Sequence, residues 1–91
     1  MKDFTDFRIA IIGLGYVGLP LAVEFGKKFK TIGFDIKTDR IEEIKDGHDS
    51  TLEVLEEDLK KAKLLSLTDN LEEISGCNFF IVTVPTPIDK E

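Results

Sequence analysis

Two hydrophobic patterns alternate along the chain: short runs of apolar residues, and longer segments in which apolar residues recur every three or four positions. Four runs predict strands, at residues 8–12 (RIAII), 31–35 (TIGFD), 64–68 (LLSLT) and 78–84 (NFFIVTV). The first and last runs are almost wholly apolar, so we expect both strands to be buried, the first on both faces of a sheet. Residues 17–29 have helical spacing and predict a helix directly after the first strand.

Polar and glycine residues mark the ends of further helical segments. Thr38 is placed to cap a helix over residues 39–46, and Gly47 is placed to end it. The sequence STLE at residues 50–53 has the spacing of a capping box and predicts the start of another helix. Residues 69–75 predict a helical turn before the last strand.

The predicted strands and helices alternate along most of the chain. Such alternation is typical of an α/β fold, in which helices connect the strands of a parallel sheet by right-handed crossovers. About four strands are predicted, whereas a doubly wound dinucleotide-binding domain usually has about six. We therefore expect residues 1–91 to form a Rossmann-type parallel sheet, the N-terminal portion of a doubly wound domain.

Composition narrows the class of partner. The 91 residues carry a net charge of −6, which argues against a nucleic-acid partner because no basic surface is available to neutralise phosphates. The apolar runs are far shorter than the ~18 residues that span a membrane, and the N-terminus lacks the apolar region of a secretory signal. We therefore expect a cytoplasmic protein with no membrane partner.

Two residue types that often serve catalysis or metal binding occur once each. Cys77 cannot form an internal disulfide, and because it precedes an apolar strand we interpret it as a small core residue rather than a nucleophile. His48 stands alone in a polar loop without further ligand residues, so we interpret it as a surface residue. The sequence therefore predicts no metal site.

Three glycines stand between the first strand and the first helix, in the sequence GLGYVG at residues 13–18. In this context Gly13 permits a tight turn, Gly15 lets a diphosphate approach the backbone, and Gly18 allows the helix to pack closely on the strand. The free N–H groups and the positive dipole end of the helix then face the phosphates. A tight turn alone is the competing interpretation, but it requires one glycine rather than three.

An acidic residue ends the second predicted strand. Asp35 lies 22 residues after Gly13, where a carboxylate can accept hydrogen bonds from both hydroxyls of an adenine ribose. It would also repel a 2′-phosphate, which favours NAD over NADP. Two nearby cations, Lys37 and Arg40, weaken that preference, and the alternative is that Asp35 serves only a turn.

The sequence TVPTP at residues 83–87 ends the last predicted strand. The carboxyl ends of strands in open α/β sheets line the ligand crevice. Thr83 and Thr86 can offer hydroxyl groups there, while Pro85 stiffens the loop. On these residues alone, an ordinary end to the strand is an equally good interpretation.

Four segments together resemble the N-terminal part of the UDP-glucose/GDP-mannose dehydrogenase family: IAIIGLGYVGLPLA, GFDIKTDRI, GHDSTLEV and FFIVTVPTPID. The segment GHDSTLEV is similar to the branch that acts on UDP-N-acetylglucosamine or UDP-N-acetylgalactosamine, of the Vi-antigen and O-antigen type. The resemblance implies oxidation of the C6 alcohol of a UDP-sugar to the uronate with two NAD, in the synthesis of capsular and other surface polysaccharides. It also implies a homodimer whose catalytic and UDP-sugar domains lie outside residues 1–91, so we expect no catalytic residue in this chain.

The resemblance also assigns cofactor contacts to positions of this chain. Tyr16 and Val17 would lie at the phosphates, Arg40 beside the adenosine end, and Thr86 would reach toward the cofactor. Lys37 stands where the family often has asparagine, and Cys77 does not match the motif of the catalytic cysteine. The expected cofactor-binding residues are Gly13, Leu14, Gly15, Tyr16, Val17, Gly18, Asp35, Arg40, Thr83, Pro85 and Thr86.

Two other functions remain open at this point. The chain could be a stand-alone nucleotide-binding or regulatory module with no catalytic partner. It could also belong to another dehydrogenase class with the same entry motif, although the sequences VPTP and STLEV argue against that class.

Overall fold

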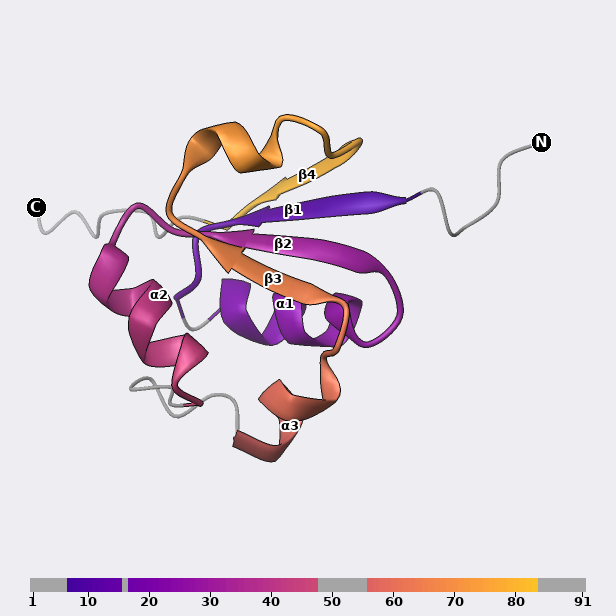
Figure 1. Cartoon of the computed structure of the whole chain (residues 1–91). Helices are drawn as coiled ribbons and strands as arrows, with labels where there is room; N and C mark the ends of the chain where they lie inside the picture. Colours follow the sequence, from indigo (N-terminus) through magenta and orange to yellow (C-terminus); the bar gives the residue numbers. More distant parts are fainter. Residues whose placement is uncertain (1–6, 16, 48–55, 84–91) are drawn as a thin grey trace, which may run out of the picture.

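The fold is built on a four-stranded parallel sheet. The computed structural model describes residues 7–15, 17–47 and 56–83. The strands lie in the order β3-β2-β1-β4, so that β1 is central and pairs with β2 on one side and with β4 on the other (Figure 1). Their bounds are β1 Arg8–Ile12, β2 Lys30–Phe34, β3 Leu65–Thr68 and β4 Phe79–Val82. The predicted Rossmann-type α/β class is therefore confirmed.

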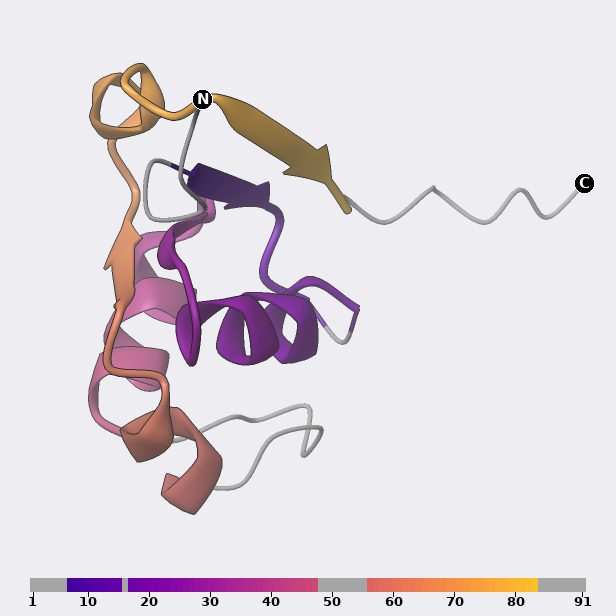
Figure 2. The same cartoon turned by 90° about the vertical axis from the view of Figure 1, so that its right-hand side faces the viewer.

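Among the described residues, the α-helices lie on one side of this sheet, and a short 3₁₀ helix lies on the other (Figures 1 and 2). The α-helices are α1 (Gly18–Gly26), α2 (Thr38–Lys45) and α3 (Glu56–Lys61), and the 3₁₀ helix is η2 (Leu71–Ile74). The helical turn predicted over residues 69–75 is thus present as η2. The predicted helix over residues 17–29 is shorter, because α1 ends at Gly26 and the chain then turns into β2. All described helices are too short or too polar to cross a membrane.

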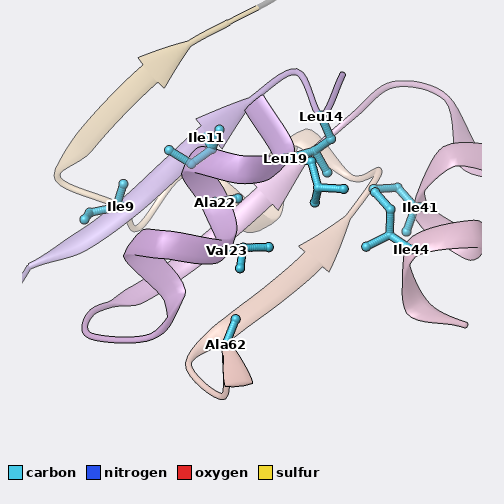
Figure 3. Close-up of a cluster of buried hydrophobic side chains, with 9 residues drawn as sticks. All are labelled: Ile9, Ile11, Leu14, Leu19, Ala22, Val23, Ile41, Ile44 and Ala62. Carbon is cyan, nitrogen blue, oxygen red and sulfur yellow. The ribbon is translucent and has the colours of Figure 1, made fainter. Parts of the chain in front are cut away.

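The hydrophobic core lies between the sheet and the α-helices (Figure 3). Ile11 of β1 packs with Leu19 and Val23 of α1, and all three are almost completely buried. Burial of each such side chain stabilises the fold by about 1.5–3 kcal/mol, which makes this layer the main source of stability. The other members of the core cluster are Ile9, Leu14, Ala22, Ile41, Ile44 and Ala62.

The predicted cap of α2 is wrong. Thr38 is the first residue of the helix, Lys37 precedes it, and no side chain caps the N-terminus. The Thr38 hydroxyl instead donates to the Asp69 carboxylate over 2.7 Å, because the end of β3 brings that charged acceptor within reach. The end of the helix agrees with the prediction, since Gly47 follows it with a φ of +88°. The predicted capping box at residues 50–53 and His48 lie outside the described residues.

The predicted burial of the last strand is also wrong. Phe80 and Val82 of β4 are 51% and 61% exposed, and Phe79 is 48% exposed. Apolar composition predicts that a strand will be covered, but coverage depends on which elements pack against it. Among the described elements, only β1 packs closely against β4. The Arg8 N–H, which donates to Asn78 Oδ1 over 2.9 Å, joins the starts of these two strands.

Candidate functional site

A cavity of about 470 Å³ lies at the carboxyl ends of β1 and β2, where the chain leaves β1 for α1. We call it the loop cavity. This is the edge of an open parallel sheet at which ligands bind in many α/β proteins. The residues that line the loop cavity are Ile12, Gly13, Leu14, Gly15, Phe34, Asp35, Ile36, Lys37 and Arg40.

Gly13 makes the tight turn out of β1. Its φ is +99°, a backbone conformation that residues with a Cβ rarely adopt. Its N–H donates to the Phe34 carbonyl over 2.8 Å, which extends the ladder between β1 and β2 by one bond before the chain turns away. The structure therefore has the turn that the sequence predicts at this position.

The next two glycines differ in what surrounds them. A Cβ on Gly18 would overlap the Gly13 carbonyl oxygen and press on the Thr83 hydroxyl, so α1 approaches β1 as closely as its backbone allows. A Cβ on Gly15 would meet no atom within 4 Å, so nothing in the described chain requires glycine there. Gly18 thus serves the fold, whereas the space beside Gly15 is left open.

Thr83, directly after β4, ties that strand to the turn. Its hydroxyl lies 2.7 Å from the Gly13 carbonyl oxygen and 3.2 Å from that of Ile12, and its N–H donates to the Ile12 carbonyl. The sequence indicates a hydroxyl at this edge but not its direction. In the structure the hydroxyl proton is directed to the backbone of the turn.

The Asp35 carboxylate binds two backbone amides. One oxygen accepts the Leu14 N–H and the other accepts the Lys37 N–H, each over 2.9 Å. A carboxylate has about four acceptor positions, so two remain for further donors. Asp35 therefore serves the turn after β2, and it also holds the backbone of residues 13–15, here called the glycine loop, while facing the loop cavity.

Arg40 of α2 also binds the backbone of the glycine loop, at Leu14. Its Nε donates to the Leu14 carbonyl over 2.6 Å, and its Nη1 pairs with the Glu43 carboxylate over 2.8 Å. The Arg40 side chain is only 10% exposed. The only sequence signal for Glu43 is its position three residues after Arg40, which is the spacing of an ion pair on a helix.

Four predicted cofactor-binding residues remain, and the structure describes one of them. Val17 immediately precedes α1 and is half-exposed. Tyr16, Pro85 and Thr86 lie outside the described residues.

Cys77 lies away from the loop cavity. It lines a separate hollow together with Arg8, and it is half-buried rather than part of the core cluster. Burial raises the pKa of its thiol, and the nearby Arg8 opposes that rise. A raised pKa disfavours the thiolate, and the interpretation that Cys77 is not a nucleophile stays a prediction.

Comparison with known proteins gives consistent matches. Residues 7–91 match the NAD binding domain of the UDP-glucose/GDP-mannose dehydrogenase family. The chain is 61% identical over 85 residues to UDP-N-acetyl-D-glucosamine 6-dehydrogenase of Pseudomonas aeruginosa, covering 93% of this chain and 20% of that protein. It is 57% identical over 89 residues to the protein of the same name from Salmonella typhi, covering 98% of this chain and 21% of that protein.

Solved structures agree with these matches. The UDP-D-ManNAc dehydrogenase of Pyrococcus horikoshii superimposes with a TM-score of 0.84 at 36% identity, over 91% of this chain and 21% of that chain. A ternary complex of GDP-mannose dehydrogenase from Pseudomonas aeruginosa superimposes with a TM-score of 0.82 at 29% identity, over 92% of this chain and 21% of that chain. The chain thus spans about one fifth of the length of the relatives that it matches. It belongs to the UDP-glucose/GDP-mannose dehydrogenase family, whose NAD binding domain it matches from residue 7 to residue 91.

Proposed function

We propose that this chain binds the adenosine diphosphate part of NAD in the loop cavity, with the diphosphate beside Gly15. The observation that carries the proposal is the open space at that glycine, because nothing in the described chain accounts for the missing side chain. A diphosphate close to the backbone does account for it, since any side chain there would occupy the same volume.

The donors and acceptors around the loop cavity fit such a ligand. The start of α1, which no acidic residue of its first turn neutralises, presents backbone N–H groups and a positive dipole end toward an anion. Asp35 has acceptor positions left for the two ribose hydroxyls, and its charge disfavours a 2′-phosphate. When bound, NAD supplies the two-electron acceptor for oxidation of an alcohol, and the role of these residues is to hold and orient it.

For the longer protein to which the chain would contribute, we propose a nucleotide-sugar 6-dehydrogenase. It would oxidise the C6 alcohol of a UDP-N-acetylhexosamine to the uronate with two NAD, for capsular or related surface polysaccharide. The support is the identity to two UDP-N-acetyl-D-glucosamine 6-dehydrogenases and to Protein CapL of Staphylococcus aureus. The catalytic and sugar-binding residues, the homodimer and the cytoplasmic location remain predictions. A stand-alone nucleotide-binding module is the alternative.

A substitution at Gly15 tests the cofactor proposal. Gly15→Ala places a methyl group in space that is empty in the described chain, and the φ of Gly15 is not positive. The free energy of unfolding should therefore hold or rise by about 0.4–1 kcal/mol, because alanine lowers the entropy of the unfolded chain. The affinity for NAD, measured by calorimetry, should fall by about tenfold or more, the effect of roughly 1.4 kcal/mol.

Gly76→Ala is the matched control. A Cβ on Gly76 also meets no atom within 4 Å, and this glycine lines the other hollow, away from the loop cavity. It should have the same small effect on unfolding and leave NAD affinity unchanged. Equal NAD affinities for the two variants would contradict the placement of the diphosphate beside Gly15.

A further inference from the structure

A second hollow, of about 440 Å³, lies where β1 and β2 begin, at the opposite end of these strands from the loop cavity. Successive side chains of a strand point to opposite faces of the sheet. Ile9 of β1 and Thr31 of β2 are buried on the face that α1 covers, so Arg8 and Lys30 point to the other face, where η2 lies (Figure 2). We call this space the basic hollow.

Three cationic side chains line the basic hollow: Arg8, Lys30 and Lys63. Glu73 of η2 is the acidic residue among the described lining residues, so the four charges leave a net charge of +2 in a chain whose overall charge is −6. Within residues 7–15, 17–47 and 56–83, none of these four side chains forms an ion pair or a hydrogen bond. The hollow therefore collects positive charge that the described chain does not neutralise.

Two of these cations are direct neighbours across the sheet. Arg8 of β1 and Lys30 of β2 are partners in the register of the two strands, so their side chains leave the same face side by side. Like charges in such a pair destabilise a sheet. Nothing in the described packing requires a cation at either position, because both side chains are exposed. An anion bound between the two side chains would turn this repulsion into attraction.

The groups around the hollow suit a phosphate. A guanidinium binds phosphate oxygens through two parallel N–H donors, and a lysine ammonium adds a point charge. A phosphate monoester carries about −1.5 to −2 charges at neutral pH, which matches the net charge of the lining better than a carboxylate does. Ser66 adds a hydroxyl that has no partner within the described chain, and Leu64, 43% exposed, adds an apolar wall. The volume is within the range of small-molecule sites.

We propose that the basic hollow is a second anion site, which binds the phosphate group of a small molecule between Arg8 and Lys30. It is separate from the diphosphate position proposed beside Gly15, because the two hollows lie at opposite ends of the strands and share no lining residue. A free phosphate ion and a phosphate ester present the same group, and they differ in whether an organic body covers Leu64.

Titration of the ¹⁵N-labelled chain with inorganic phosphate and with phenyl phosphate tests the proposal. Both should shift the amide signals of Ser66 and Gly76 and reach saturation. Tighter binding of phenyl phosphate would assign an ester with an apolar body, and equal or tighter binding of inorganic phosphate would assign the free ion. Because the cations are exposed, the affinity should fall when salt is raised from about 0.05 M to about 0.5 M.

Substitution of one cation should separate binding from stability. Lys30→Gln should weaken phosphate binding about three- to tenfold, the scale of one exposed charge-assisted contact. Without phosphate, the same change should raise the thermal midpoint by about 1–5 °C, because it removes the repulsion from Arg8. Lys63→Gln should also weaken binding and covers the case in which Lys30→Gln does not fold. Lys28→Gln is the matched control, since Lys28 is an exposed lysine outside the described lining.

The outcomes decide between a built site and general attraction to positive charge. Absence of saturable shifts at Ser66 and Gly76 would overturn the proposal. An equal loss of phosphate affinity in Lys28→Gln and Lys30→Gln would also overturn it, because the anion would then respond only to net charge. Gly15→Ala keeps this site apart from the cofactor proposal: it should leave phosphate binding here unchanged. Failure of the chain to bind NAD would contradict only the proposed function.

Discussion

The close contact between α1 and β1 makes Gly18→Ala the sharpest test of the packing. A Cβ at Gly18 would overlap the Gly13 carbonyl oxygen and lie 2.8 Å from the Gly13 carbonyl carbon. The atoms that the Cβ would meet belong to the Gly13 backbone, which is fixed by two hydrogen bonds. The Gly13 N–H donates to the Phe34 carbonyl, and the Gly13 carbonyl accepts from the Thr83 hydroxyl. Overpacking of this kind costs about 1–3 kcal/mol, and the rigid obstacle places the cost at the upper end.

A smaller gain opposes that cost, because alanine is favoured over glycine in a helix by up to about 1 kcal/mol. The net loss should therefore be about 2 kcal/mol. For a chain of 91 residues this corresponds to a fall of about 8–16 °C in the thermal midpoint, measured by circular dichroism. Gly76→Ala, which has open space around it, should not lower the midpoint. A midpoint for Gly18→Ala at or above that of the parent chain would refute the reasoning.

Three further changes probe the glycine loop and the lone cysteine. Asp35→Ala leaves the buried Leu14 N–H without its carboxylate, so urea unfolding should show a loss of about 1.5–3 kcal/mol; an unchanged midpoint would mean that this bond is not formed. Thr83→Val removes the hydroxyl donor to the Gly13 carbonyl and should cost about 0.5–1.5 kcal/mol in the same assay, while Thr83→Ser should retain most of the stability. Because burial raises the pKa of the Cys77 thiol above its ordinary value, the rate of alkylation by iodoacetamide should still be rising at the pH where an unperturbed thiol reaches its plateau; a plateau near neutral pH would contradict a raised pKa.

The sequence predicted the structure best at the glycines, because a glycine between a strand and a helix usually has one physical reason to be there. The positive φ of Gly13 and the close packing at Gly18 follow from the spacing of glycines between a strand and a helix, and both are found. The four strands were located to within two residues, because short apolar runs with polar residues at both ends are typical of strands in a sheet.

The features that were predicted wrongly depend on distant parts of the chain. The residues of β4 are as apolar as those of a buried strand, but their exposure is set by which elements cover them. The Thr38 hydroxyl forms no cap because Asp69, distant in sequence, offers a charged acceptor. The direction of the Arg40 side chain could not be read from the sequence, because only the folded chain brings Leu14 within its reach.

The central position of β1 has a consequence for the order in which the protein is made. β1 leaves the ribosome first, but the strand that covers its second edge contains Phe79, the partner of Ile9, which is synthesised 70 residues later. At about 5–20 residues per second this delay is roughly 4–14 s, a long interval for an apolar strand with an unsatisfied edge. Nascent chains of this protein should therefore be clients of ribosome-associated chaperones until β4 emerges.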